Sequence, residues 1–486
     1  MQKISIKTIY LILVISIGLV GLGVGSTFAM FTASSKIDNP ISFTAGIFGE
    51  SDVMETVEIT VSAGETKATN LHVTNSTNSN LNYVMWYIDE GLDIELGSKR
   101  TDSGTYQTTI GAGEEHKYEV SIRNNSSSSV TVVVGVSSGT GSVTLSSDMK
   151  MVPQSELKLK PTLASVITNL YNNSTKTAVP NNSITYQYDT TNNLMKDTAG
   201  NIRYYGASPN NYVYFNCDSY PRTNCELWRI IGVFDGKIKL MRNESIGNYS
   251  WDTSDSTITD GYGANEWSQA DLMKLLNPGH ESESVGGSLY YNSKAGGTCY
   301  NGYNNGTTSC NFTSTGIKND TTRNMIAETT WNLGGWDTSE IFSNEMYEKE
   351  RGTTVISNPI DGITRTTTWT GKIALAYPSD YGYATDLSKC SQKLYNYDSS
   401  TDSYACRSND WMYSIITNSG RNPEWLLTSI SDTAGIAFYV TSTGFVSHGN
   451  SVCNARGVAP VLYLGSNQDI VAGDGSQSNP YQLANS

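Results

Sequence analysis

An apolar run near the N-terminus decides in which compartment this chain folds. The run, Ile9 to Met30, follows Lys3 and Lys7 and is long enough to cross the ~30 Å hydrocarbon core of a bilayer. The small residues around Ala29 suit a signal peptidase, so the run is either a signal peptide cleaved after Ala29 or a retained membrane anchor. In both cases the lysines stay on the cytoplasmic side, so the rest of the chain is predicted to lie outside the cell.

The cysteines fit that location. All seven follow residue 216, and six of them form close pairs in the sequence. Because exported proteins fold in oxidising surroundings, we expect disulfides between these pairs, although spacing alone does not fix the connectivity. The expected bonds are Cys217–Cys225, Cys299–Cys310 and Cys390–Cys406. Cys453 is left over and is expected to be a small buried residue, since no Cys-x-x-Cys or Cys/His spacing typical of a metal site occurs.

Composition excludes one class of partner. Lys+Arg 32 against Asp+Glu 46 gives a net charge of −14, whereas nucleic-acid binding needs clustered Lys and Arg. Charged residues make up only 16% of the chain, while soluble domains average ~25%. A polar but uncharged surface of this kind is typical of β-rich extracellular proteins. We therefore expect no nucleic-acid partner, and contact with a membrane only through the N-terminal segment.

The texture of the sequence predicts a multidomain protein. Residues 1–30 form the signal or transmembrane helix, and residues 31–149 alternate polar and apolar residues in short runs, which indicates an all-β sandwich of immunoglobulin-like type. Residues 150–180 contain two prolines and one short helical pattern, and are expected to be a linker. Residues 181–486 combine helical patterns with later buried strands, which indicates an α+β domain.

Three segments of the last region carry specific predictions. WRIIGVFDGKIKLMRN is expected to be a hairpin that turns at Asp235-Gly236. NEWSQADLMKLLN is expected to be a helix capped by Ser268, and GKIALAYPSD is expected to be a buried strand.

The order of segments in the last region carries a resemblance. WRIIGVF, NEWSQADLMKLLN, GKIALAYPSDYGYA, WLLTS, AFYV with TGFV, and GVAPVLYL resemble a family of exported proteins of uncharacterised function in low-GC Gram-positive bacteria. That family's domain is similar to the C-type-lectin-like fold of formylglycine-generating enzymes and of variable receptor-binding proteins. The resemblance covers roughly Asn201 to Leu483 and implies a C-type-lectin-like fold. One departure is Ala459, which stands where the family commonly has Arg, whereas Arg456 comes earlier.

A second resemblance concerns the leader. GLGVGSTFAMFTASSKIDNPISFTAGIF, from Gly21 to Phe48, is similar to the leader and first strand of camelysin and of the biofilm-fibre proteins of bacilli. Since those proteins form β-sandwiches that can assemble into fibres, this resemblance implies a camelysin-like sandwich and a structural role by self-assembly as an alternative.

No complete catalytic motif is present. His448 lies five residues before Cys453, so these two are the candidates for a thiol-dependent site, as a low-ranking alternative. The formylglycine-generating enzymes bind copper through a thiol pair, which the single Cys453 does not match, so their activity is not transferred. Asp-rich segments make Ca²⁺ binding possible, but neither WDTSDSTITDG nor AGDGS has the spacing of a known calcium loop. Otherwise no cofactor, no metal and no enzymatic activity are expected.

The remaining hypothesis concerns the surface. Lectin-like folds carry function on long loops, where exposed aromatic side chains supply stacking area to a ligand. Trp336, Trp411, Tyr300 and Tyr303 are the candidate ligand-binding residues in such loops. We therefore expect an extracellular protein, secreted or at the cell surface, that binds a glycan or a protein of a host or neighbouring cell in adhesion.

Overall fold

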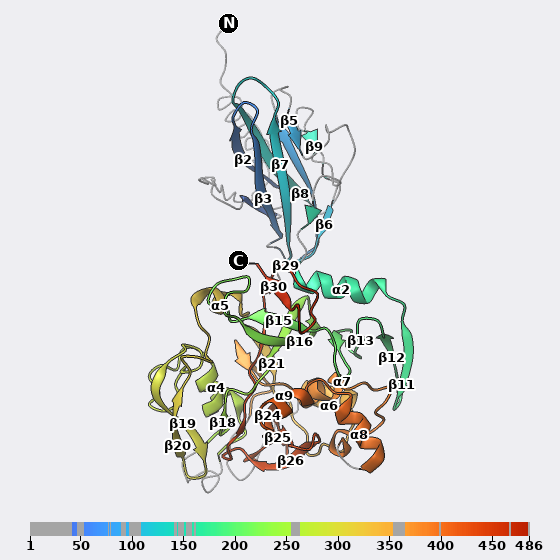
Figure 1. The fold of residues 1–486 in the computed structure, drawn as a ribbon, viewed down its shortest axis with the longest axis vertical. Coiled ribbons are helices and arrows are strands. Elements are labelled where there is room, and N and C mark those ends of the chain that lie inside the picture. Colours follow the sequence, from blue (N-terminus) through green and yellow to red (C-terminus); the bar gives the residue numbers. More distant parts are fainter. Residues whose placement is uncertain are drawn as a thin grey trace, which may run out of the picture. The chain divides into compact units, whose positions relative to one another are not determined.

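The computed structural model describes residues 41–45, 53–75, 77, 79–88, 94–96, 108–139, 143, 150–151, 158–159, 162–253, 263–352, 365–397, 400–465 and 468–484. The chain divides into two compact units, Met1–Lys160 and Pro161–Ser486, and both contain several β-sheets (Figure 1). The expected leader and its cleavage position at Ala29 lie outside the described residues. Within the described part of the chain, no helix has the length and apolar character needed to cross a membrane.

The first unit is built from two five-stranded sheets. One runs in the order β1-β3-β7-β10 with β5 also paired to β7, and the other runs β2-β8-β4-β6 with β9 also paired to β4. The strands are β1 (Ile41–Ala45), β2 (Val53–Val61), β3 (Thr66–Asn75), β4 (Leu81–Ile88), β5 (Ile94–Leu96), β6 (Thr108–Ile110), β7 (Glu115–Asn124), β8 (Val130–Gly139), β9 (Lys150–Met151) and β10 (Lys158–Leu159).

Alternation along these strands forms a core of mainly aliphatic side chains, together with Tyr83 and Tyr87, between the two sheets. In β8 every second residue, Val130, Val132, Val134 and Val136, belongs to this core together with side chains of β2, β3, β4, β6 and β7. Successive side chains of a strand point to opposite faces, so the valines of one parity share one face. The expected all-β character of this region is therefore present in its described residues.

The second unit contains an eleven-stranded sheet and a five-stranded sheet. The larger follows the path β11-β12-β13-β14-β16-β15-β30-β29, with β17, β28 and β23 joined to it through β16, and the smaller runs β18-β27-β24-β25-β26. The strands of the larger sheet are β11 (Thr177–Asn181), β12 (Ile184–Asp189), β13 (Leu194–Lys196), β14 (Ile202–Tyr204), β15 (Tyr212–Phe215), β16 (Glu226–Phe234), β17 (Lys237–Arg242), β23 (Ile373–Ala374), β28 (Val461–Tyr463), β29 (Ile470–Ala472) and β30 (Tyr481–Leu483).

The smaller sheet is accompanied by two separate hairpin-like pairs. The five strands are β18 (Asn248–Tyr249), β24 (Glu424–Ser429), β25 (Ile436–Val440), β26 (Val446–Ser451) and β27 (Arg456–Gly457). The two-stranded sheets are β19 (Ala295–Gly302) with β20 (Gly306–Asn311), and β21 (Thr329–Asn332) with β22 (Thr368–Gly371).

Short helices accompany these sheets in the second unit. They are α2 (Leu163–Asn173), α4 (Asp271–Leu276), α5 (Asp320–Met325), α6 (Ser343–Glu350), α7 (Pro378–Ala384), α8 (Ser400–Ser408) and α9 (Tyr413–Asn418), with 3-10 turns η2 (Trp267–Gln269) and η3 (Leu394–Asn396). Most of the buried side chains of this unit form one continuous aromatic and aliphatic core.

The predicted hairpin is confirmed: β16 and β17 pair in antiparallel fashion and turn at Asp235-Gly236, where both residues have positive φ. Three other expectations need correction. Residues 150–180 were expected to be a linker, but Leu163, Ile167 and Tyr171 of α2 are buried in the core of the second unit, which begins at Pro161. The helix buries its apolar face in that core, so it is part of the second unit.

The other two corrections concern helix starts. The helix expected to be capped by Ser268 begins later, at Asp271, because Ser268 lies in a 3-10 turn where its backbone N–H bonds to the Glu266 side chain. In the expected strand GKIALAYPSD only Gly371, the end of β22, and Ile373–Ala374 lie in strands, and Pro378 starts helix α7. Proline is favoured in the first helical turn, where its missing N–H costs no hydrogen bond.

Candidate functional site

The three expected disulfides are formed. Cys217 is bonded to Cys225, Cys299 to Cys310 and Cys390 to Cys406, while Cys453 is buried and not disulfide-bonded. Bonds of this kind persist in oxidising compartments, so they fit an extracellular protein. Each one closes a short segment rich in polar residues.

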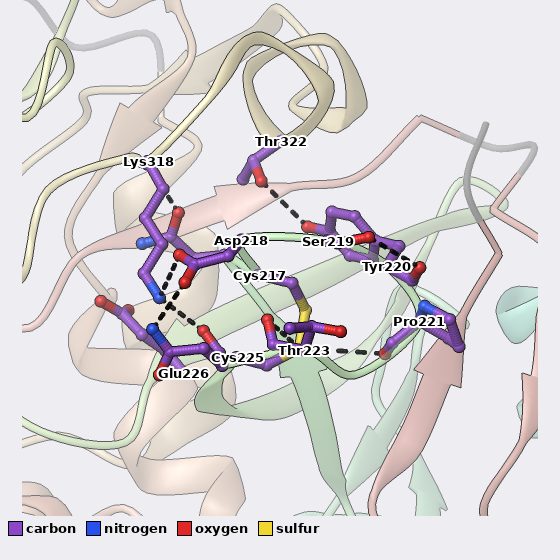
Figure 2. The surroundings of a disulfide bond; sticks show 12 residues. Cys217, Asp218, Ser219, Tyr220, Pro221, Thr223, Cys225, Glu226, Lys318 and Thr322 are labelled. Carbon is purple, nitrogen blue, oxygen red and sulfur yellow. Dashed lines mark hydrogen bonds and ion pairs between the residues drawn. A yellow bond between two sulfur atoms is a disulfide. The ribbon is translucent and has the colours of Figure 1, made fainter.

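The loop closed by Cys217–Cys225 is tied to the segment before α5, as Figure 2 shows. Lys318 Nζ lies 3.1 Å from Asp218 Oδ1 and donates to the Asn224 carbonyl oxygen at 2.5 Å. Asn224 Nδ2 donates to the other Asp218 carboxylate oxygen at 2.7 Å. The hydrogen bonds from Asn224 and Lys318 hold the pKa of the Asp218 carboxyl below its usual value. The loop thus keeps a fixed pattern of charges on an exposed rim.

A cleft of about 530 Å³ opens beside this loop, and a second cleft of about 530 Å³ shares Glu226 and Arg242 with it, so these two residues form a common wall. The first is lined by Asp218, Asn224, Cys225, Glu226, Arg242, Ser293, Thr313, Ser314 and Lys318. The second is lined by Glu226, Leu227, Arg242, Asn243, Glu244, Asn418 and Gln477. Strands β16 and β17 therefore contribute to both clefts, whereas the loop closed by Cys217–Cys225 lines only the first.

The wall between the clefts is an ion pair fixed from several sides. Arg242 Nε lies 2.9 Å from Glu226 Oε2, and Trp228 Nε1 donates to the same oxygen at 3.0 Å. Arg242 Nη1 donates to the Glu244 carbonyl oxygen at 3.0 Å. Burial alone would lower the pKa of Arg242, but the Glu226 charge raises it above its ordinary value. Trp228 is fully buried, so packing holds the ring that donates the hydrogen bond to Glu226 in place.

The lining determines which ligands the clefts suit. Hydroxyl, amide, carboxylate and cationic groups dominate it, and the cleft at the disulfide loop contains both carboxylates and cations. Apolar or purely anionic ligands find few partners there. Hydrogen-bonding groups in a concave site fix the orientation of a polar ligand such as a saccharide or a polar peptide segment.

The aromatic residues selected from sequence lie elsewhere, and neither cleft is lined by any of them. The prediction that Trp411 is a surface residue is wrong: it is fully buried, and its Nε1 donates to the Tyr204 carbonyl oxygen at 3.0 Å. Trp336 is half-buried, and the Lys349 ammonium lies 3.4 Å from its ring centroid. One face of that ring is already occupied by a cation.

The two tyrosines lie on the hairpin that carries the second disulfide. Tyr300 is half-buried on β19, and its carbonyl oxygen accepts a hydrogen bond from Ser250 N at 3.0 Å. Tyr303, at the turn of the hairpin, is 46% exposed and is the candidate that the structure places at the surface.

Sequence analysis missed two more exposed rings. Tyr395 is 40% exposed and Tyr404 is 64% exposed, and both belong to the segment closed by Cys390–Cys406. The Tyr395 ring centroid lies 5.4 Å from that of Phe445 and 5.8 Å from that of His448. Position in this segment did not signal their exposure, because Tyr397 of the same segment is fully buried in the core.

The structure gives His448 a partner other than Cys453. His448 Nδ1 lies 3.0 Å from Ser339 Oγ, so the hydrogen bond found at this ring is to a serine. Ser339 is fully buried, and the Cys453 thiol lies 3.2 Å from Ser451 Oγ. A thiol-histidine site finds no support in this geometry.

The described residues contain no group of three or more His, Cys, Asp or Glu side chains placed to hold a metal ion. Of the Asp-rich segments, residues 254–261 of WDTSDSTITDG lie outside the described part, while Asp474 of AGDGS accepts a hydrogen bond from Ser476 N at 2.9 Å.

Comparison with known proteins gives little. No protein-family model and no curated protein matches this chain. Among solved structures, a periplasmic inhibitor of g-type lysozyme from Aeromonas hydrophila, PliG, is similar over 20% of this chain and 98% of its own, with 11% identity and a TM-score of 0.12. A likeness this low carries no argument about either fold or function.

Proposed function

We propose that this is an exported binding protein whose second unit, as a C-type-lectin-like domain, recognises a glycan or a protein at the cell surface. The observation that carries the proposal is the pair of polar clefts on either side of the Glu226–Arg242 wall. Three disulfides support the extracellular setting. The polar lining supports a ligand rich in hydroxyl or amide groups, which is the chemistry of a saccharide.

The experiment is a glycan and surface-protein array probed with the full chain, in the presence and absence of EDTA. Ser314→Trp fills the cleft at the disulfide loop and Gln477→Trp fills the other, since both residues line their clefts and are exposed. Thr307→Trp, at an exposed position of β20 outside both clefts, is the matched control.

We expect at least one cleft variant to weaken binding tenfold or more, while Thr307→Trp binds like the wild type. Equal binding by all three variants would remove the clefts from the proposal. Loss of binding with EDTA would add Ca²⁺ as a cofactor. If no ligand class binds and the full chain forms fibres instead, the alternative role in surface-fibre or biofilm-matrix assembly through the first unit takes its place.

A further inference from the structure

The most deeply buried charged pair in the second unit joins two distant parts of the chain. Lys239 of β17 and Asp380 of α7 are 141 positions apart, and both side chains have 0% exposure. Lys239 Nζ lies 2.5 Å from Asp380 Oδ2. No solvent reaches either group, so this contact is dry. The amine and the carboxylate, the two groups from which an amide bond can form, are in contact.

Aromatic rings surround the amine. Its Nζ lies 4.5 Å from the ring centroid of Tyr377 and between 5.3 and 5.5 Å from those of Phe234, Trp331 and Tyr463. Burial lowers the pKa of Lys239 to about 8, which brings a neutral, nucleophilic amine within reach near neutral pH. Lysine amines are made reactive in just such desolvated surroundings.

The carboxyl group is held at both oxygens. Arg203 Nη1 donates to Asp380 Oδ1 at 2.8 Å, and the Tyr377 backbone N–H donates to Oδ2 at 3.0 Å. Burial alone would raise the pKa of Asp380, but the charges of Lys239 and Arg203 lower it well below its ordinary value. Arg203 is itself anchored by Asp197 Oδ2, 2.6 Å from its Nε. Its guanidinium is therefore fixed beside the oxygen on which negative charge collects when the carboxyl carbon is attacked.

We propose that Lys239 and Asp380 condense to an intramolecular isopeptide bond. Lys239 Nζ passes one proton across the short contact to Asp380 Oδ2, against the neighbouring charges that favour the carboxylate, and the freed lone pair forms the Nζ–Cγ bond, which leaves the negative charge on Oδ1 beside Arg203. A second proton then moves from Nζ to Oδ2. The Cγ–Oδ2 bond breaks and that oxygen leaves as water, so an ammonium and a carboxylate become one amide and one water without any further reactant.

The dry surroundings favour the product. In water the separate ions are stabilised by hydration, but a buried ion pair loses that hydration, and its mutual attraction repays the loss only in part. An amide carries no net charge and so has a much smaller cost of burial. After condensation Arg203 still has Asp197 as its partner, which keeps the remaining charges paired.

The covalent link would join β17, which leads into the Glu226–Arg242 wall through Arg242, to helix α7. The segment that it closes contains the Cys299–Cys310 hairpin. Unlike a disulfide, an amide resists reduction, so this bond would hold the centre of the second unit closed under conditions that open the three disulfides.

The test is a mass measurement on the full chain, purified, reduced, alkylated and denatured. We expect an intact mass lower by one water molecule, and a branched tryptic peptide in which Lys239 is uncleaved and linked to the peptide 373–389 that contains Asp380. Only linear peptides, with cleavage after Lys239 and the full mass, would show an ion pair only and overturn the proposal.

Two variants sharpen the test. Lys239→Arg keeps the positive charge beside Asp380, but its guanidinium does not condense, so we expect the full mass and slower migration on a denaturing gel after reduction. Lys237→Arg, two positions away on the same strand and partly exposed, is the matched control and should retain the branched peptide. A branched peptide that persists in Lys239→Arg would assign the link to another residue and equally overturn the proposal.

Discussion

The two units of this chain are stabilised in different ways. The first is held by a core of aliphatic side chains and two tyrosines, and the buried polar side chains among its described residues are not ionisable: Asn75, Asn124, Ser137 and Ser138. The second buries a set of ionisable side chains, Asp189, Asp197, Arg203, Arg229, Lys239, Arg242, Asp252, Glu266, Glu350, Arg365, Asp380, Asp386, Asp410 and Glu424, and carries the three disulfides.

The difference follows from loop content. Regular β-strands satisfy their own backbone groups and present apolar faces, so the first unit needs no other device. The second unit orders long polar segments with few apolar residues, which cannot bury enough surface to offset their conformational entropy. The three disulfides reduce that deficit by restricting the unfolded chain. Calorimetry of the full chain, in which the units can unfold as separate transitions, tests the comparison.

Removing one buried cation should have the largest effect. Arg203→Met leaves Asp197 and Asp380 without their guanidinium partner in a dry core, and breaking such a pair costs about 3–5 kcal/mol. We expect the free energy of unfolding of the second unit to fall by that amount, while that of the first unit stays unchanged. Arg123→Met, at an exposed position of the first unit, should change stability by less than about 0.5 kcal/mol. Equal effects of the two variants would contradict the comparison.

Opening one disulfide should have the next largest effect. Replacing Cys299 and Cys310 together by Ser removes a bond that closes a short loop, which is worth roughly 2–3 kcal/mol. Reduction of the wild type should likewise lower only the second transition, because no cysteine precedes Cys217. A first-unit transition that shifts on reduction would show that the two units do not unfold independently.

The first unit should instead be sensitive to packing. A Cβ at Gly135 would lie 2.3 Å from the ring of Trp86, which is fully buried and donates from Nε1 to Ser137 Oγ at 3.0 Å. Gly135→Ala should therefore lower the free energy of unfolding of the first unit by about 1–3 kcal/mol, the usual cost of overpacking. Gly64→Ser, at a position with open space around it but positive φ, separates backbone strain from the clash and should cost less.

The last expected effect is a dependence of stability on pH that comes from Asp410 in the second unit. Burial raises the pKa of Asp410 from 3.8 to about 7, so between these values the folded state binds a proton that the unfolded state has released. Stability contributed by this group therefore falls as pH rises, by up to about 1.4 kcal/mol per pH unit. Asp410→Asn mimics the protonated form, and its stability relative to the wild type should rise between pH 4 and 7. A constant difference would contradict the raised pKa.

Sequence spacing predicted the local features well. The close cysteine pairs and the Asp235-Gly236 hairpin require only a few neighbouring residues to form, and both are present. Predictions from the sequence were wrong where contacts between distant residues determine whether a side chain is buried. Trp411 stands in a polar stretch typical of a surface loop, yet the Arg229 guanidinium lies 4.8 Å from its ring centroid and the Tyr204 backbone accepts its indole hydrogen.

The clefts were not predicted for the same reason. Glu226 and Arg242 lie at the open end of the predicted hairpin, so their proximity follows from it, but Lys318 comes from a segment far along the chain. No local pattern indicates that Lys318 shares a cleft with them. His448 similarly meets Ser339 through the tertiary fold and not the nearby Cys453.

The sequence by itself determined the alternation that forms the first unit, the disulfide pairs, and a polar surface without clustered positive charge. These properties depend on composition and short spacing, which a chain carries before it folds. Only the tertiary structure decided that α2 joins the second core, that two polar clefts flank Glu226–Arg242, and that Lys239 meets Asp380 in a dry aromatic shell. Burial and the contact of distant side chains are properties of the packed molecule, because each depends on every segment that excludes water from the site.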